Sequence, residues 1–316
     1  MTTGNSALAD LATLRDWLRY AVSRFNAAQL SYGHGTDCAL DEAAFLMLSA
    51  LHLPIDELEP WLDARLTLAE RRRVLDLIEA RIATRKPAAY LVGKAWIKGH
   101  PFRIDERVIV PRSYIGELLV GQPDALAADP TTVASVLDLC TGSGCLAILA
   151  ALAFEDATVD AVDISTDALD VARLNIADYG LDHRVTPLHS DLFAALADRR
   201  YDLIVSNPPY VTAAAVAAFP PEYRAEPPLA HLGGEDGMDL VRRILSEAGS
   251  HLAPGGTLVM EIGMGRDVIE RDYPELPVIW LDTETSEGEV MLVTAEDLMA
   301  CGEAAGRTKK RRARKA

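Results

Sequence analysis

The tetrapeptide Asn207–Tyr210 follows an apolar run and carries the groups that methyl transfer to a planar NH₂ group requires. The side-chain oxygen of Asn207 and the carbonyl of Pro208 can each accept one N–H bond, which orients the nitrogen and stabilises the positive charge developing on it. Pro208 and Pro209 stiffen the loop, and the ring of Tyr210 can cover one face of the planar group. We therefore predict Asn207, Pro208 and Tyr210 as catalytic residues and the whole tetrapeptide as the substrate-binding segment. An ordinary turn is the alternative.

A glycine-rich loop follows another apolar run, residues 133–139, and indicates a nucleotide-type cofactor. Gly142 and Gly144 permit tight turning and close approach of a ligand to the backbone at the end of a strand. The same spacing, with Ala147, also satisfies a loose dinucleotide fingerprint, so a nicotinamide dehydrogenase is an alternative. The carboxylate of Asp138 favours S-adenosylmethionine, because it would meet a pyrophosphate unfavourably but can accompany a cationic sulfonium. The cofactor-binding residues predicted here are Asp138, Cys140, Thr141, Gly142, Ser143 and Gly144.

Two further carboxylates follow predicted strands and extend this cofactor site. Asp163 ends the second strand, where a carboxylate can accept hydrogen bonds from both ribose hydroxyls. Asp191 follows the third strand and could accept from an adenine amino group while Leu192 or Phe193 packs on the ring. The alternative is that Asp191 caps a following helix. We also count Asn207 among the cofactor-binding residues.

Strands and helices alternate from about residue 115 onward, which predicts an α/β fold with a mostly parallel, doubly wound sheet. The last two strands are joined by a turn over residues 282–288 that is too short for a crossover helix, so they should pair antiparallel. The predicted strands are 133–139, 158–162, 185–188, 201–205, 257–262, 278–281 and 289–293, and the clearest helices are 144–153 and 166–178.

The N-terminal part of the chain is predicted to be helical. Apolar residues that recur at steps of three and four predict one helix over 7–28 and a second over 39–51. A third begins at Thr67, where Thr67-x-x-Glu70 fits a capping box, and runs to about Lys86. These helices carry no polar cluster, so we interpret them as a docking module rather than as a source of chemistry.

The spacing of apolar residues changes after this module, over residues 95–110. This change predicts a hairpin and then a third extended stretch over residues 108–110. The resulting domains are 1–94, a small N-terminal helical domain for substrate docking; 95–114, a hairpin linker; 115–300, the methyltransferase domain; and 301–316, a basic tail.

The formal charge is distributed unevenly along the chain. The net charge is −16, but residues 307–316 contain seven Lys/Arg and no acid, which leaves −23 for the rest. A strongly acidic body should repel bare nucleic acid and attract a basic partner, so no direct DNA binding is expected. The tail is expected to be disordered, either as a solubilising end or as a contact for RNA.

Composition points to the cytoplasm. No apolar run is long enough to cross a bilayer, and the N-terminus lacks a secretion pattern. The four cysteines form no CxxC pair, which fits a reducing compartment. The seven histidines are scattered along the chain, so we expect no metal site.

The glycine-rich loop, Asp163 and the Asn207–Tyr210 tetrapeptide together resemble the class I methyltransferases that modify planar NH₂ groups. Over residues 7–298 the chain resembles the HemK/PrmB family of protein-glutamine N5-methyltransferases, with further support from residues 85–93 and 110–113. The resemblance implies a Rossmann-like domain with an antiparallel last strand, S-adenosylmethionine as methyl donor and a protein glutamine as acceptor.

Within the family the chain is most similar to the PrmB branch, which implies a glutamine of the basic ribosomal protein three of the large subunit as the target. The release-factor branch typically reads Pro-Arg-Pro-acid-Thr-Glu where this chain has Pro111-Arg112-Ser113 and then Tyr114-Ile115-Gly116-Glu117. Peptide release factors, the substrates of that other branch, are the alternative. Three other stretches resemble PrmB, namely Tyr32–Asp37, Asp138–Cys145 and Glu222–Pro227.

The linker departs from the branch at Tyr114, where proline is usual, and we expect this change to loosen the linker loop. The resemblance also makes Arg112 and Glu117 candidates near the site, with an interdomain salt bridge as the preferred interpretation.

Two other functions fit parts of the pattern less well. Adenine-N6 methyltransferases share the logic of the tetrapeptide, but they need a basic face and a domain that holds a flipped base. A ribosome-assembly chaperone with a retained fold would be free to lose Gly142, Gly144, Asp163 and Asn207, all of which are intact.

Overall fold

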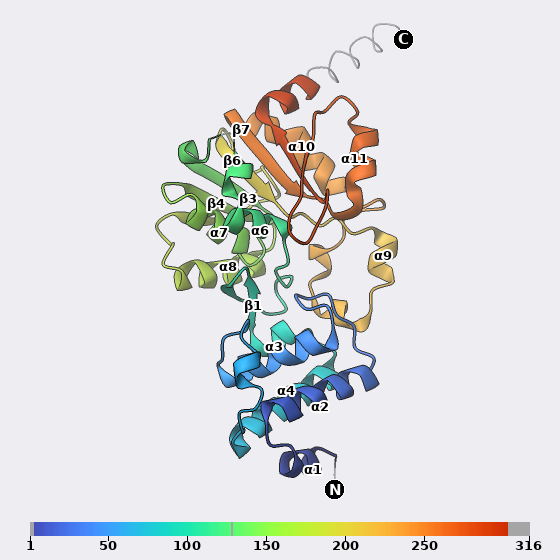
Figure 1. The fold of residues 1–316 in the computed structure, drawn as a ribbon. Helices are drawn as coiled ribbons and strands as arrows, with labels where there is room; N and C mark the ends of the chain where they lie inside the picture. The colour runs from blue at the N-terminus through green and yellow to red at the C-terminus, as the bar shows by residue number, and fades with distance from the viewer. Residues whose placement is uncertain (1–2, 128, 303–316) are drawn as a thin grey trace. The chain divides into compact units, whose positions relative to one another are not determined.

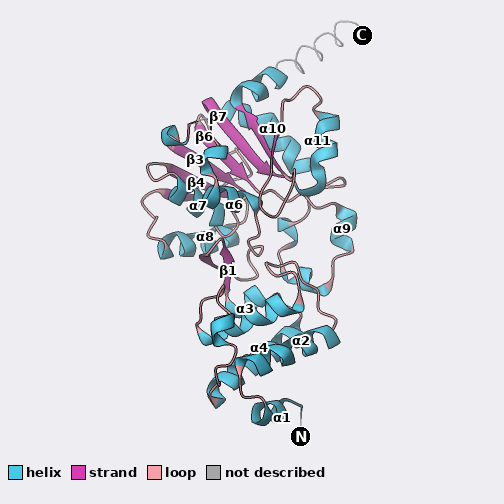
Figure 2. Cartoon of the chain, in the orientation of Figure 1, coloured by secondary structure: helices cyan, strands magenta, loops and turns pink. Residues whose placement is uncertain are grey.

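The computed structural model describes residues 3–127 and 129–302, so the basic tail and its predicted RNA contact lie outside the described residues. The chain divides into two compact units (Figures 1 and 2). The helical unit comprises Met1–Ala95, Ile104–Glu106 and Phe219–Glu226, and the sheet unit comprises Trp96–Arg103, Arg107–Ala218 and Pro227–Ala316. The domain boundaries predicted from the sequence assign Phe219–Glu226 to the methyltransferase domain, whereas in the structure this segment belongs to the helical unit.

The helical unit contains α1 Thr3–Asp10, α2 Leu14–Ala27, α3 Ala39–Leu51, α4 Leu68–Thr84 and α5 Ala88–Val92. The single helix predicted over 7–28 is wrong, because the chain breaks into α1 and α2. Thr13 accepts from the backbone N–H of Asp16, and the Asp16 carboxylate accepts from the N–H of Thr13, so this capping box starts a new helix. The predicted helix over 39–51 and the Thr67–Glu70 capping box are confirmed.

The core of the helical unit is formed by the apolar stripes of α2, α3 and α4. Trp17 and Phe25 of α2 are fully buried, together with Leu46 of α3 and Ile78 of α4. The apolar period in the sequence therefore marks the faces along which these helices pack.

The sheet unit follows the predicted alternation of strands and helices. Its elements are α6 Tyr114–Gly121, β3 Ser135–Leu139, α7 Cys145–Ala153, β4 Thr158–Asp163, α8 Thr166–Asp178, β5 Val185–His189, β6 Tyr201–Ser206, α9 Ala213–Ala217, α10 Asp239–His251, β7 Leu252–Glu261, α11 Arg266–Asp272, β8 Ile279–Leu281 and β9 Val290–Thr294. Residues 295–302 form a further helix. A separate two-stranded sheet, β1 Lys94–Ile97 and β2 His100–Arg103, is the predicted hairpin.

The extended stretch predicted over 108–110 is irregular rather than a strand. Val108 and Val110 are both buried, so the run of three apolar residues that predicts a strand here reflects burial alone.

The large sheet has the strand order β5-β4-β3-β6-β7-β9-β8. The first five strands in this order are parallel, β9 is antiparallel to β7, and β8 and β9 pair antiparallel as predicted. This is the fold class expected from the sequence, a class I methyltransferase fold. Figure 1 shows α7 and α8 on one face of the sheet and α10 and α11 on the other.

Each strand contributes side chains to a core on both faces. In β3, for example, Val136 packs with Ile148 of α7, whereas its neighbour Leu137 belongs to the core with Ile244 of α10. Burial on both faces explains why these strands read as continuous apolar runs rather than alternating ones. Among the described residues, no helix has the length and apolarity needed to cross a membrane.

Candidate active site

The parallel pairing of β3, β4 and β6 brings three of the predicted site segments to one edge of the sheet. Leu139, the last residue of β3, pairs with Val162 of β4 and with Ser206 of β6. The glycine-rich loop, Asp163 and Asn207 therefore all begin at the same level, at the carboxyl ends of their strands. In an open α/β sheet this edge is where ligands bind.

The glycine-rich loop turns sharply between β3 and α7. Gly142 and Gly144 have φ angles of 55° and 79°, in the left-handed region that favours glycine, and Gly144 is the N-cap of α7. Cys140 shares this conformation at φ 60°, and burial raises the pKa of its thiol. The carbonyl of the buried Ser143 accepts a hydrogen bond from the Asn175 side chain at 2.8 Å. The positive φ angles and the Asn175 hydrogen bond together define the course of the loop.

Asp138 lies beneath this loop with no exposed surface. Its Oδ2 accepts hydrogen bonds from Thr141 Oγ1 at 2.6 Å and from the Ala147 backbone N–H at 2.9 Å. Burial raises the pKa of the carboxyl to about 7, against the effect of these two donors. Through Oδ2 Asp138 therefore shapes the turn, while its Oδ1 is buried without a hydrogen-bond partner among the described residues.

Asp163 connects the ends of β3 and β4. Its Oδ2 accepts from the backbone N–H of Gly142 at 2.9 Å, and its Oδ1 accepts from the backbone N–H of Ser165 at 2.8 Å. Burial raises the pKa of this carboxyl, but the side chain remains partly exposed. Each oxygen keeps a second lone pair, so the carboxylate can still accept from ribose hydroxyls.

Two predictions concern residues 190–193, namely contact with the adenine of the cofactor and capping of a following helix by Asp191. The Asp191 carboxylate accepts from Arg243 Nη2 at 3.0 Å, and the segment that follows is a series of turns, so the capping alternative is wrong. The Ser190 hydroxyl instead accepts the Ala195 N–H. Phe193 is buried in the core and stacked on His251, with ring centroids 4.6 Å apart. Leu192 is buried in the same core.

The Asn207–Tyr210 tetrapeptide leaves β6 directly. Asn207 is partly exposed, and its side-chain amide makes no hydrogen bond to any residue that the structure describes. Pro208 is buried, whereas Pro209 is partly exposed. An amide held on a stiff loop with its oxygen unused by the protein is available to accept from a ligand N–H group.

Glu261 fixes the orientation of Tyr210 and was missed in the sequence. The Tyr210 hydroxyl donates to Glu261 Oε1 at 2.8 Å, while Ser113 Oγ and the Tyr114 backbone N–H donate to Oε2 at 2.7 and 2.9 Å. Glu261 is 1% exposed, and burial raises the pKa of its carboxyl to about 7. The same burial, with the negative charge of Glu261, raises the pKa of Tyr210, so its phenol stays protonated and donates.

A sequence signal for Glu261 existed. Ser206 pairs with Met260, so Glu261, the last residue of β7, stands level with Asn207 at the same sheet edge. It could have been found by the reasoning that selects Asp163. Gly263, at φ 51°, adds a close approach, since a Cβ there would stand 2.6 Å from the Tyr210 ring.

The linker residues take roles different from those expected. Tyr114 does not loosen the chain, because it begins α6 and donates an N–H to Glu261 that proline would lack. Glu117 pairs with Lys98 at 3.6 Å and accepts from Thr285 Oγ1 at 2.6 Å. Since both partners belong to the sheet unit, the interdomain salt bridge proposed for Glu117 is wrong. The charge of Arg112 acts on Tyr210, where it opposes the rise in pKa.

Comparison with known proteins finds close relatives over nearly the whole chain. The family model described as the methyltransferase small domain matches residues 124–219. The ribosomal protein uL3 glutamine methyltransferase of Bradyrhizobium diazoefficiens is 59% identical over 295 residues, which cover 92% of each chain. Its counterpart in Bordetella pertussis is 56% identical and covers 93% of this chain and 99% of its own. A solved methyltransferase from Pyrococcus furiosus has a TM-score of 0.46 and 19% identity, over 68% of this chain and 96% of that one.

Proposed function

The chain belongs to the family of ribosomal protein uL3 glutamine methyltransferases, and from this premise we propose that it methylates the side-chain nitrogen, N5, of a glutamine in that ribosomal protein. The methyl donor is S-adenosylmethionine. The observation that carries the proposal is the free amide of Asn207, on a stiff loop at the sheet edge where the glycine-rich loop also begins.

The tetrapeptide would hold the acceptor in the following way. The Asn207 Oδ1 and the Pro208 carbonyl each accept one N–H of the glutamine amide, which aims its nitrogen and stabilises the positive charge that forms during transfer. The Tyr210 ring covers one face of the amide, and Glu261 keeps that ring in place through the phenol. The proton can leave after the methyl group arrives, so no strong general base is required.

The glycine-rich loop and Asp163 would hold the cofactor. Asp163 is partly exposed and retains acceptor capacity, so we assign the ribose hydroxyls to it. Asp138 acts through the loop that it shapes, with Thr141 as its partner. When bound, S-adenosylmethionine supplies an electrophilic methyl group on a cationic sulfur.

The charge of the chain supports a basic protein substrate. The net charge without residues 307–316 is −23, because those residues contribute seven positive charges. An acidic surface attracts a basic ribosomal protein before it is covered by RNA, and it slows the approach of nucleic acid itself. We assign docking of this substrate to the helical unit, and we place the reaction in the cytoplasm, where ribosomal proteins are made.

Replacing Asn207 tests the proposal directly. The variant Asn207→Ala should lose at least about a hundredfold in kcat on uL3, the effect typical of removing one preorganised group from a site of this kind. Its affinity for S-adenosylmethionine, measured by calorimetry, should fall by much less than its rate, because Asn207 is only one of the predicted cofactor-binding residues. Asn26→Ala, an exposed position in α2, is the matched control and should be fully active. Undiminished methylation by Asn207→Ala would sink the mechanism.

The alternative substrate is distinguished in the same assay. Purified enzyme is incubated with labelled donor and with uL3 or a peptide release factor in parallel, and mass spectrometry locates the methyl group on a glutamine. Labelling of the release factor alone would overturn the choice of substrate while leaving the chemistry intact.

A further inference from the structure

Between β6 and α10 the chain forms an arm, residues 212–230, that starts directly beyond the tetrapeptide. Its base is closed, because the Val211 N–H donates to the His231 carbonyl and the Gly233 N–H donates to the Val211 carbonyl, both at 2.9 Å. Its tip, Phe219–Glu226, belongs to the helical unit. The arm thus begins beside Tyr210 and carries the chain from one unit into the other.

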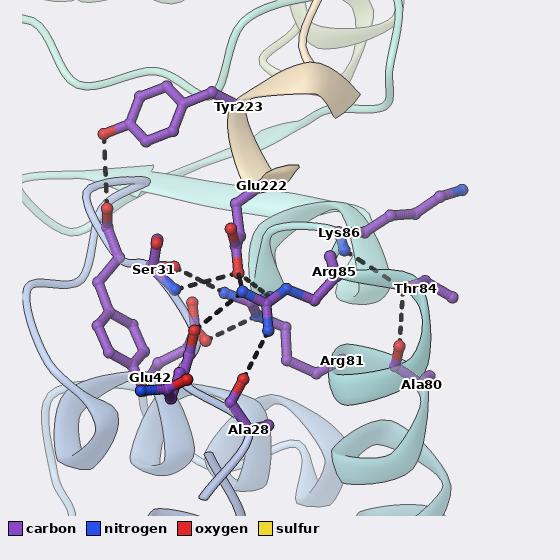
Figure 3. A network of polar contacts seen from close by, with 12 residues as sticks. Ala28, Ser31, Glu42, Ala80, Arg81, Thr84, Arg85, Lys86, Glu222 and Tyr223 are labelled. Carbon is purple, nitrogen blue, oxygen red and sulfur yellow. Dashed lines mark hydrogen bonds and ion pairs between the residues drawn. The ribbon is translucent and has the colours of Figure 1, made fainter. Parts of the chain in front are cut away.

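Glu222 anchors the arm tip within the helical unit (Figure 3). Its side chain has no exposed surface. Glu222 Oε1 accepts from the Ser31 backbone N–H at 3.0 Å and pairs with Arg85 Nη2 at 2.8 Å and Arg81 Nη1 at 3.7 Å. Arg81 is also fully buried and donates from Nε to Glu42 at 2.7 Å. Two carboxylates and two guanidinium groups therefore form a polar cluster around the tip, so the expectation that the N-terminal helices carry no polar cluster is wrong.

Tyr223 and Glu226 add a second set of contacts on the same tip. The Tyr223 ring lies 4.2 Å from the His34 ring, and His34 Nε2 lies 3.5 Å from Glu226 Oε2 with both side chains buried. Gly33 makes room for this arrangement, since a Cβ there would stand 2.4 Å from the Tyr223 hydroxyl. The stretches Tyr32–Asp37 and Glu222–Pro227, which the sequence marks separately as similar to one branch of the family, thus form one structure.

This anchor is made of directional contacts rather than of apolar burial. Buried ion pairs contribute little net stability compared with apolar packing of the same volume, but they can specify one arrangement over others. These contacts therefore favour one seating of the tip within the helical unit. From Asn207 to Pro221 the chain carries no charge, and all side chains of α9 are at least partly exposed. This stretch offers a surface of small apolar groups continuous with the tetrapeptide.

We propose that Glu222 is a positioning residue for the protein substrate: by seating the arm tip among Arg81, Arg85 and Ser31, it holds the arm so that the acceptor segment of the substrate reaches Asn207. The occupant of the uncharged stretch is the segment of the basic ribosomal protein that carries the glutamine, so the inference rests on the proposed function. Glu222 does not touch the reacting atoms, and its effect is expected in substrate binding rather than in the methyl-transfer step.

Steady-state kinetics on uL3 tests this assignment. Glu222→Ala should raise the KM for uL3 about tenfold, equivalent to about 1.4 kcal/mol, and change kcat less than about threefold. The affinity for S-adenosylmethionine should be unchanged. Glu222→Gln keeps an acceptor for the Ser31 N–H and should recover part of the KM. Glu57→Ala, an exposed carboxylate of the same unit, is the matched control and should behave as wild type.

A charge-balanced double variant separates positioning from stability. Glu222→Ala leaves Arg85 without its anion, so the helical unit should melt earlier; adding Arg85→Gln should restore much of the melting temperature. The KM for uL3 should stay raised in the double variant. A KM that returns to normal with stability, or one that Glu222→Ala never changes, would overturn the assignment. A wild-type enzyme that leaves uL3 unmethylated would instead overturn the proposed function, and this inference with it.

Discussion

Both units bury carboxylates, but they satisfy them in different ways. In the helical unit, Glu42 and Glu222 meet the guanidinium groups of Arg81 and Arg85. In the sheet unit, Asp138 and Glu261 are equally buried, yet all their hydrogen-bond donors among the described residues are hydroxyl or backbone N–H groups. Burial raises the pKa of each of these two carboxyls to about 7.

The two kinds of partner serve different purposes. Ion pairs anchor one segment against another, whereas neutral donors preorganise the groups around the site. An ion pair fixes two segments against each other, and its charges cancel locally, which suits the arm tip. A network of neutral donors orients nearby groups without adding a cation of its own near a site that receives a cationic methyl donor. On this interpretation the helical unit uses charge to hold the chain, whereas the sheet unit uses carboxylates to shape a loop and to orient Tyr210.

The largest expected effect comes from removing one buried cation, which tests directly whether ion pairs stabilise the helical unit. Arg81→Met should destabilise the helical unit by about 3–5 kcal/mol, because Glu42 and Glu222 would lose a shared partner in a buried place. Hydrogen exchange of peptides from α2, α3 and α4, followed as urea is raised, measures this loss locally.

Two companion variants show whether charge is the cause. Arg72→Met, at an exposed position on the same helix, should leave exchange unchanged. Adding Glu42→Met to Arg81→Met removes both members of the closest pair and should recover most of the lost stability. Equal losses in the single and double variants would mean that packing volume, and not the ion pair, stabilises this region.

The pH dependence of stability tests the carboxylates of the sheet unit. The carboxyl of an unfolded glutamate has a pKa of about 4, whereas burial raises the pKa of Glu261 in the fold to about 7. Between these values the folded state holds an extra proton, so the stabilisation is complete below about pH 4 and is lost as the pH rises through about 7. The variant Glu261→Gln has no titrating group at this position, so its stability lacks this contribution to the pH dependence. The stability of wild type relative to this variant should therefore fall by up to about 3 kcal/mol between pH 4 and pH 8.

Urea unfolding of both proteins at a series of pH values measures this difference. Asp138 is present in both, so its own titration cancels in the comparison. A gap between the two proteins that is independent of pH would show that the Glu261 carboxyl has an ordinary pKa in the fold.

Local signals in the sequence predicted much of the sheet unit. Apolar runs and the turn chemistry between them fix the strands, and parallel pairing then brings Gly142, Asp163 and Asn207 to one edge without further information. The break between α1 and α2 was missed because the apolar period continues across it, although the Thr13–Asp16 capping box is visible in the sequence.

Contacts distant in sequence could not be predicted in this way. Ser113 and Glu261 are separated by 148 positions and Ser31 and Glu222 by 191, so no local pattern links them. The hydrogen bonds of Asp138 to Thr141 and Ala147 were not predicted either, because side-chain direction depends on the turn that follows the strand. Phe193 similarly lies in the core because His251 stacks on it.

The smallest expected effect concerns the phenol that links Glu261 to the tetrapeptide. Tyr210→Phe keeps the ring but removes its hydroxyl, so the ring loses the bond that fixes its orientation while Ser113 and the Tyr114 N–H still satisfy Glu261. We expect stability to fall by about 1 kcal/mol and kcat/KM on uL3 to fall about tenfold, with unchanged affinity for the methyl donor. Tyr201→Phe is the matched control, because its hydroxyl donates to the Asp160 carboxylate at 2.7 Å from the opposite end of the same strand. It should lose similar stability and no activity. Equal losses of activity in the two variants would mean that Tyr210 acts through the stability of β6, and that the neutral network around Glu261 does not position the acceptor.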